Sequence, residues 1–187
     1  IVMSNTRRQE LLRWAAERDD RWIIEDDYDS EFRFNAHPMP AMHTLDGGKK
    51  VIYLNTFSKT LAPSIRISYM VLPGELMDIF RKKLGFYSCT VPSFEQHTLE
   101  RFLSRGYFEK HINRMRKFYR NSRNRLVQLL ENCPWAGKLT IEEQDAGLHF
   151  LLYVDTALAG ETLLERCEQA GLRVNTLSSY YHGPMPD

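Results

Sequence analysis

Three short apolar runs, each ending at once in polar or turn-forming residues, narrow the possible architecture of this chain. Residues 22–24 run into Glu25-Asp26-Asp27, residues 51–54 run into the polar residues 55–59, and residues 67–72 end at Pro73-Gly74. Short apolar runs with such boundaries are typical of buried strands. A helix is predicted over residues 7–20, with Ser4 or Thr6 as its N-cap. The pattern predicts an α/β layer with polar side chains at the strand ends.

The connection between the second and third predicted strands fixes their relative direction. It is only about a dozen residues long, and a parallel crossover needs at least that many, usually with a helix. Pro63 lies in this connection and disfavours a long helix there. We therefore expect the third strand to run antiparallel to the second.

The second half of the chain changes character. Helices are predicted over residues 75–84, over 93–105 with Ser93 as the cap, and over 108–132. A β-β-α-β pattern follows, with strands at 139–141, 148–154 and 172–175 and a helix at 161–170 that ends at Gly171. This change of pattern predicts a second, smaller α+β domain beginning near residue 135.

The helix predicted over residues 108–132 is amphipathic, with opposite apolar and basic arcs. The apolar arc comprises Ile112, Met115, Phe118, Tyr119, Leu126, Leu129 and Leu130. The basic arc comprises Arg114, Arg116, Lys117, Arg120, Arg123 and Arg125. The basic arc could contact DNA, but a solvated face or a dimer contact is the favoured interpretation.

Composition excludes several classes of protein. The chain has 187 residues and a formal net charge of +1, which does not indicate a nucleic-acid or anionic-membrane surface. No apolar run approaches the roughly 20 residues of a membrane span. The three cysteines, Cys89, Cys133 and Cys167, are far apart, which argues against a disulfide framework or a zinc ribbon. We expect a cytoplasmic protein that does not contact a membrane.

The segment after the second strand carries the strongest chemical signal. Lys59 lies just past a buried strand, with Thr56 and Ser58 before it and Arg66 seven positions on. Sites in open α/β sheets lie at the carboxyl ends of strands, where a partly desolvated lysine is a nucleophile toward carbonyl groups. The two hydroxyls and the guanidinium could bind a phosphate. The alternative is that Lys59 is an ordinary surface lysine in a polar loop.

The segment after the first strand offers complementary groups. Asp26 could pair with a protonated ring nitrogen of a cofactor, and Tyr28 could hydrogen-bond an oxygen of the same ring. Asp27 or Asp29 could instead cap a turn. The acidic cluster could also bind Mg²⁺, although no further motif completes a metal site and none is expected.

Together these segments resemble a known family. The sequence EDDYDSEFRF at residues 25–34, followed by SKTLAPSIR at 58–66, resembles fold-type I pyridoxal-phosphate enzymes. More narrowly, the chain resembles the aminotransferase-like domain of MocR regulators, a branch of the GntR transcription factors. Residues 108–116, 145–149 and 179–181 also match that pattern, whereas Ser68 replaces its usual glycine.

The resemblance implies a fold and a set of roles. The fold would be α/β, with residues 1–92 part of the cofactor-binding large domain, 93–134 connecting helices including a long interdomain helix, and 135–187 part of the small C-terminal domain. Lys59 would form the internal aldimine with pyridoxal 5'-phosphate, and Asp26 would pair with the pyridinium nitrogen. Tyr28 would hydrogen-bond the phenolic oxygen, and Arg66 would bind the phosphate with Ser58 and Thr56.

The resemblance also implies function. We expect the effector domain of a MocR/GntR-type regulator that senses an amine or amino acid, forms a homodimer and binds DNA only through a winged helix-turn-helix absent from this chain. One alternative is a working aminotransferase that uses the same residues, with Lys59 as the proton shuttle. The other is a structural dimerisation domain without cofactor.

Overall fold

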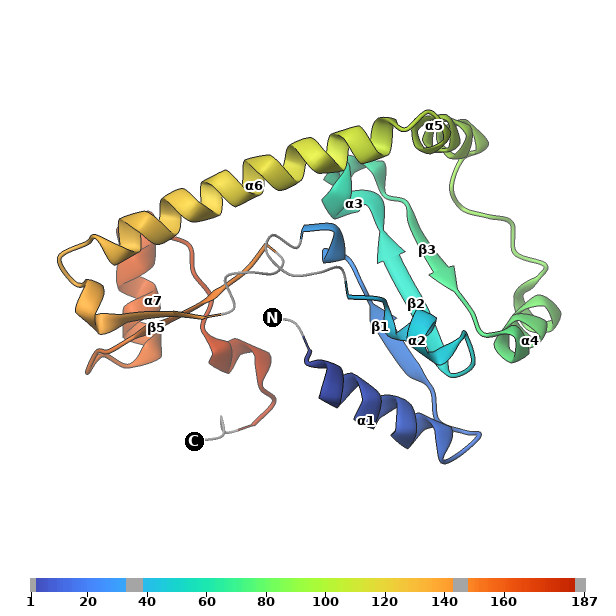
Figure 1. The fold of residues 1–187 in the computed structure, drawn as a ribbon, viewed down its shortest axis with the longest axis horizontal. Coiled ribbons are helices and arrows are strands. Elements are labelled where there is room, and N and C mark those ends of the chain that lie inside the picture. Colours follow the sequence, from blue (N-terminus) through green and yellow to red (C-terminus); the bar gives the residue numbers. More distant parts are fainter. Residues whose placement is uncertain (1–2, 33–38, 143–147, 184–187) are drawn as a thin grey trace.

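The computed structural model describes residues 3–32, 39–142 and 148–183 of the chain. Its helices are α1 (Asn5–Ala16), α2 (Met42–Asp46), α3 (Phe57–Thr60), α4 (Gly74–Leu84), α5 (Ser93–Ser104), α6 (Tyr107–Glu131) and α7 (Gly160–Gln169). Its strands are β1 (Ile23–Asp26), β2 (Val51–Thr56), β3 (Ser68–Val71), β4 (Leu139–Glu142) and β5 (Leu151–Val154). The first three strands form one sheet and the last two form another, and α6 runs from one sheet to the other (Figure 1).

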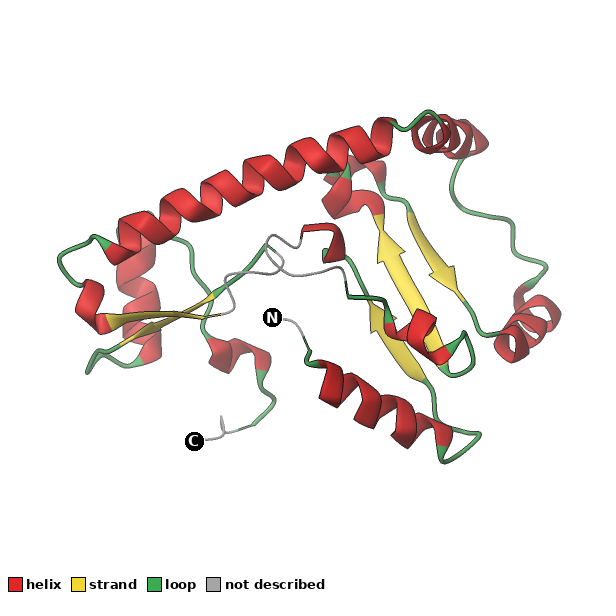
Figure 2. Ribbon diagram, viewed as in Figure 1, coloured by secondary structure: helices red, strands yellow, loops and turns green. Residues whose placement is uncertain are grey.

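The three-stranded sheet confirms the predicted strand directions. β1 pairs parallel to β2, with Asp26 opposite Leu54 in the register. β2 pairs antiparallel to β3, with Thr56 opposite Ser68. The carboxyl ends of β1 and β2 therefore meet at one edge of the sheet, where β3 begins (Figure 2).

One face of this sheet carries the core. Ile23 and Val51 pack there with Ala15 of α1 and Met42 of α2. Side chains alternate between the faces of a strand, so Ile24 lies on the opposite face, where it is 67% exposed. Asp26 shares that opposite face and is exposed as well.

A second apolar cluster ties α6 to the loop after β1. Phe32, at the end of the short 3₁₀ helix η1 (Ser30–Phe32), is fully buried against Ile112 of α6. Met115 and Tyr119 of the predicted apolar arc join this cluster. On the same arc, Phe118 is exposed between these two residues, and Leu126 and Leu129 are exposed farther along the helix. The described residues therefore cover only part of the predicted apolar arc, around Ile112, Met115 and Tyr119.

The structure differs from the predicted basic arc at Arg116. Its Nε donates a hydrogen bond to the Glu31 carbonyl oxygen, so this side chain reaches inward to η1 instead of remaining in solvent. A guanidinium on a long stem can reach around a helix to a carbonyl on the packed side. The arc as a whole is therefore not one uniform charged surface.

Several predicted boundaries also need correction. α1 ends at Ala16 with Ser4 as its N-cap, so the predicted N-cap is confirmed but the helix is shorter than expected. α5 has Pro92 as its N-cap, and Ser93 is its first residue.

The predicted strand at 172–175 is wrong, because these residues pair with neither β4 nor β5 in the described part of the chain. An apolar run becomes a strand only where a neighbour supplies backbone hydrogen bonds. The motif residues 33–34 and 145–147 lie outside the described residues. The division at residues 92 and 134 stays a prediction.

Candidate functional site

A cavity opens where β1 and β2 end and β3 begins. It has a volume of about 290 Å³. It is lined by Asp26, Leu54, Asn55, Thr56, Ser68, Tyr69 and Met70. Two residues predicted from the sequence, Asp26 and Thr56, thus line the same hollow although 30 positions separate them. The parallel pairing of β1 and β2 produces this meeting of strand ends.

The chain turns sharply where β2 ends, and Thr56 organises the turn. Its hydroxyl accepts a hydrogen bond from the Ser58 backbone N–H at 3.2 Å, which caps α3. The same hydroxyl donates to the Ile67 carbonyl oxygen at 3.2 Å and lies 3.1 Å from the Ser58 hydroxyl. Thr56 therefore holds the start of α3 beside the start of β3.

Arg66 has a strained backbone conformation, and its side chain reaches the turn after β2. It follows the short 3₁₀ helix η2 (Pro63–Ile65) with φ 48° and ψ 31°, in the left-handed region. That conformation costs a residue other than glycine about 1–2 kcal/mol. Its Nη1 donates to the Ser58 hydroxyl at 3.5 Å. Strain of this kind concentrates at functional positions, and here it accompanies a guanidinium beside two hydroxyls.

Lys59 occupies the single turn of α3, directly after Ser58. The sequence predicted a partly desolvated lysine, but its side chain is exposed among the described residues. The segment around it is nevertheless fixed. The Thr60 carbonyl oxygen contacts Nε2 of His111 on α6 at 2.9 Å, and Phe57 packs edge-on against Phe108 with centroids 5.9 Å apart.

Tyr28 follows β1 and is half-buried. Burial raises the pKa of its phenol above the ordinary value, and the nearby charges of Asp29 and Asp26 and the Tyr180 hydroxyl raise it further. Tyr28 therefore stays protonated at neutral pH and can donate a hydrogen bond.

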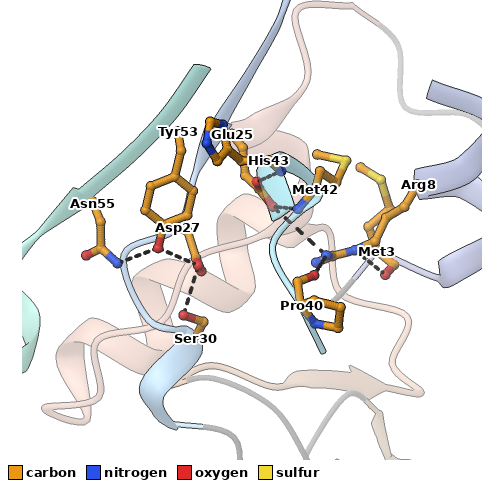
Figure 3. Close-up of polar contacts among 10 residues, drawn as sticks. All are labelled: Met3, Arg8, Glu25, Asp27, Ser30, Pro40, Met42, His43, Tyr53 and Asn55. Atoms are coloured by element: carbon orange, nitrogen blue, oxygen red, sulfur yellow. Dashed lines mark hydrogen bonds and ion pairs between the residues drawn. The ribbon is translucent and has the colours of Figure 1, made fainter. Parts of the chain in front are cut away.

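The sequence interpretation missed a hydrogen-bond chain behind the cavity (Figure 3). The Tyr53 hydroxyl and the Ser30 hydroxyl both donate to Oδ2 of Asp27, at 3.0 and 2.9 Å. Asn55 Nδ2 donates to the Tyr53 hydroxyl at 2.9 Å. The alternation of side chains along a strand could have placed Tyr53 and Asn55 on one face. Asp27 thus accepts from two side-chain hydroxyls, and the interpretation that Asp27 or Asp29 caps a turn stays a prediction.

Ser68 was also missed as a site residue. It lines the cavity and faces Thr56 across the antiparallel pair. Ser68 stands where the resembled pattern has glycine, and the predicted antiparallel pairing would have placed it beside Thr56.

The arrangement suits a phosphorylated ring that contains nitrogen. Asp26 offers a carboxylate for a protonated ring nitrogen, and Arg66 with the neighbouring hydroxyls offers donors to a phosphate. Within the described residues, no group of three His, Cys, Asp or Glu side chains is placed to hold a metal ion. None of the helices described there is long and apolar enough to cross a membrane.

Comparison with known proteins agrees with this chemistry. Residues 2–177 match the family described as aminotransferase class I and II. The chain is 40% identical over 184 residues to the HTH-type transcriptional regulator YdeL of Bacillus subtilis, covering 98% of this chain and 39% of YdeL. It is also 40% identical over 171 residues to the probable rhizopine catabolism regulatory protein MocR of Rhizobium meliloti, covering 90% of this chain and 34% of that relative.

A solved structure extends the comparison to three dimensions. The kynurenine aminotransferase of Pyrococcus horikoshii, crystallised in complex with PMP, superposes with a TM-score of 0.76 at 33% identity. The match covers 92% of this chain and 42% of that one. The chain thus spans about two fifths of the length of the proteins that it resembles.

Proposed function

Because this chain belongs to the class I and II aminotransferase family, we propose that it forms part of the pyridoxal 5'-phosphate-binding effector domain of a MocR/GntR-type transcriptional regulator. The observation that carries this proposal is the shared position of Asp26 and Thr56 in one cavity, beside the Ser58–Arg66 contact. The 40% identity to YdeL over 98% of the chain supports the regulator assignment. DNA binding would belong to a separate domain.

The chain's own side chains divide the task of holding the cofactor. Asp26 would accept the proton of the ring nitrogen, and Tyr28 would donate to the ring's phenolic oxygen. Arg66 would bind the phosphate together with Ser58 and Thr56. Lys59 would hold the cofactor covalently through its amine. When bound, pyridoxal 5'-phosphate supplies an electrophilic aldehyde carbon and an electron-withdrawing ring.

Sensing would use the contacts between the site and α6. Thr60, next to Lys59, meets His111 at 2.9 Å, and Phe32 packs against Ile112. Both segments that carry cofactor ligands are therefore joined to the first turns of one 25-residue helix. An amine or amino acid that displaces Lys59 would shift the position of α6, and such a shift can bias an attached DNA-binding module. We propose that the domain works as a homodimer in the cytoplasm. The free thiols of Cys89, Cys133 and Cys167 suit such a reducing compartment.

A second candidate is a working aminotransferase. The 33% identity and TM-score of 0.76 to the Pyrococcus horikoshii kynurenine aminotransferase favour it. In that case Lys59 Nζ would also accept the proton removed from the substrate's Cα. The exposure of Lys59 is compatible with such a role.

The experiment that tests the proposal is a titration of the full-length protein with pyridoxal 5'-phosphate, followed by absorption in the visible. The proposal predicts a visible band in the wild type and in Lys49→Ala, whose side chain is exposed in the turn before β2, and no band in Lys59→Ala. Absence of the band in the wild type would refute both cofactor functions and leave a structural dimerisation domain.

A panel of amino acids then separates the two candidates. A regulator should change its affinity for its operator DNA when the right amine is added, without releasing a 2-oxo acid. An aminotransferase should release the 2-oxo acid with repeated turnover in the presence of an amino-group acceptor.

A further inference from the structure

The hydrogen-bond chain behind the cavity joins the two strand ends that carry the site (Figure 3). Ser30 and Tyr53 donate to Asp27, and Asn55 donates to Tyr53, with all three distances between 2.9 and 3.0 Å. Asn55 Oδ1 accepts in turn from the Thr56 backbone N–H at 2.5 Å. An unbroken path therefore runs from the loop after β1 to the last residue of β2.

The residues of this path are direct sequence neighbours of the predicted cofactor-binding residues. Asp27 lies between Asp26 and Tyr28, and Asn55 directly precedes Thr56. The backbone pairing of β1 and β2 stops at the hydrogen bond from Asp27 N–H to the Leu54 carbonyl oxygen, 2.9 Å long. Beyond that point, in the part of the chain that the structure describes, side chains alone hold the two strand ends together, and strand ends without such bonds fray.

The path has one consistent set of donors and acceptors. A carboxylate only accepts, so Tyr53 must donate to Asp27 and can then accept from Asn55. Burial and the charge of Asp27 raise the pKa of the Tyr53 phenol above its ordinary value, so the hydroxyl keeps its proton. Asn55 is 4% exposed, and both ends of its amide are used. Satisfied networks that are at least partly buried, as this one is, rigidify the segments that they join.

We propose that Asp27, Tyr53 and Asn55 are positioning residues that set the spacing between Asp26 and the turn that carries Thr56, Ser58 and Lys59. This inference rests on the proposed function, because the spacing matters only if one cofactor bridges both segments. Binding constellations need to be held to within roughly 0.5 Å by such supporting groups. None of the three residues is assigned a contact with the cofactor itself.

The test compares variants of the full-length protein. Tyr53→Phe removes one hydroxyl and keeps the ring. Tyr119→Phe is the matched control, because it removes the same hydroxyl from another half-buried tyrosine, and the Tyr119 hydroxyl makes no hydrogen bond among the described residues. Asp27→Asn keeps an acceptor for Tyr53, whereas Asp27→Ala removes it, so this second pair keeps the test valid if Tyr53→Phe folds poorly.

Three measurements are made on each variant. The first is the dissociation constant for pyridoxal 5'-phosphate. The second is the circular dichroism of the visible band at saturating cofactor, which reports how rigidly the ring is oriented. The third is hydrogen–deuterium exchange of residues 27–32 and 56–60 without cofactor, which reports whether the strand ends open.

The proposal predicts roughly tenfold weaker binding for Tyr53→Phe and Asp27→Ala, with loss of dichroism per bound cofactor and faster exchange in both segments. Asp27→Asn and Tyr119→Phe should stay near the wild type. If Tyr53→Phe matches Tyr119→Phe in binding and dichroism, the positioning role is refuted while the proposed function stands. If the wild type itself shows no visible band, the proposed function is refuted and the positioning role with it.

Discussion

The buried ion pair of Glu25 gives the sharpest stability prediction. Glu25, on the core face of β1, accepts hydrogen bonds from the backbone N–H groups of Met42 and His43, at 2.8 and 3.0 Å (Figure 3). Helix α2 has no side-chain cap of its own at Ala41, so the carboxylate of a distant strand serves instead. Arg8 of α1 lies 3.9 Å from the same carboxylate, and each side chain is only 9% exposed.

Glu25→Ala should cost about 3–5 kcal/mol, the usual cost of leaving one partner of a buried pair unpaired. We expect the lower end, about 3 kcal/mol, because Arg8 would keep its bonds to the Met3 and Pro40 carbonyl oxygens. Replacing both charges, as in Arg8→Met with Glu25→Ala, should cost less than the sum of the two single changes, because no charge is then left buried.

Glu10→Ala is the control. The Arg7–Glu10 pair is shorter, at 3.1 Å, but its side chains are 66% and 44% exposed. An exposed pair contributes at most about 1 kcal/mol. The assay is urea denaturation of the full-length protein, comparing transition midpoints at equal slope. If Glu25→Ala and Glu10→Ala lower stability equally, burial does not decide the value of these pairs and the reasoning is wrong.

Three further predictions follow from the same structure. Phe32→Ala should cost about 3–5 kcal/mol of unfolding free energy, because Phe32 is fully buried against Ile112, whereas Phe94→Ala, at an 80% exposed position, should change the urea midpoint little; equal losses would contradict the α6 contact. Burial raises the pKa of the Glu31 carboxyl above its ordinary value of 4.5. At pH values above 4.5 the folded state therefore binds more protons than the unfolded state, and the free energy of unfolding falls as the pH rises between the unfolded-state and folded-state pKa values of Glu31. Glu31→Gln should flatten that fall in melting temperatures measured from about pH 4 to about pH 7, and an unchanged slope would refute the assignment. Arg66→Gly should relieve the left-handed backbone and cost no stability, yet weaken pyridoxal 5'-phosphate binding roughly 10- to 100-fold; unaltered affinity in a titration would remove Arg66 from the site.

Much of the fold followed from local patterns. The apolar runs before Glu25 and Asn55 became β1 and β2, and the short connection around Pro63 led to the antiparallel β3. The strand expected at 172–175 failed because pairing depends on neighbours that periodicity does not reveal. The length of α1 was overestimated for a related reason, since the chain must turn after Ala16 to begin β1 at Ile23.

The part of the candidate site that lies at the strand ends could be predicted from the sequence. Asp26 and Thr56 end β1 and β2, and the parallel pairing of these strands brings both residues to one cavity. Ser58 and Arg66 were placed by the turn between β2 and β3, which the sequence indicated through its hydroxyls and Pro63. The support by Asp27, Tyr53 and Asn55 depends on which way each side chain points and on exact register, so it became visible only in three dimensions.

One measurement tests directly whether Lys59 carries the cofactor. The full-length protein is saturated with pyridoxal 5'-phosphate, reduced with borohydride, digested and mapped by mass spectrometry. We expect a pyridoxyl group on the peptide that contains Lys59 and none on the exposed Lys49. A reduced, cofactor-loaded protein whose modification lies on another lysine, with Lys59 unmodified, would contradict it.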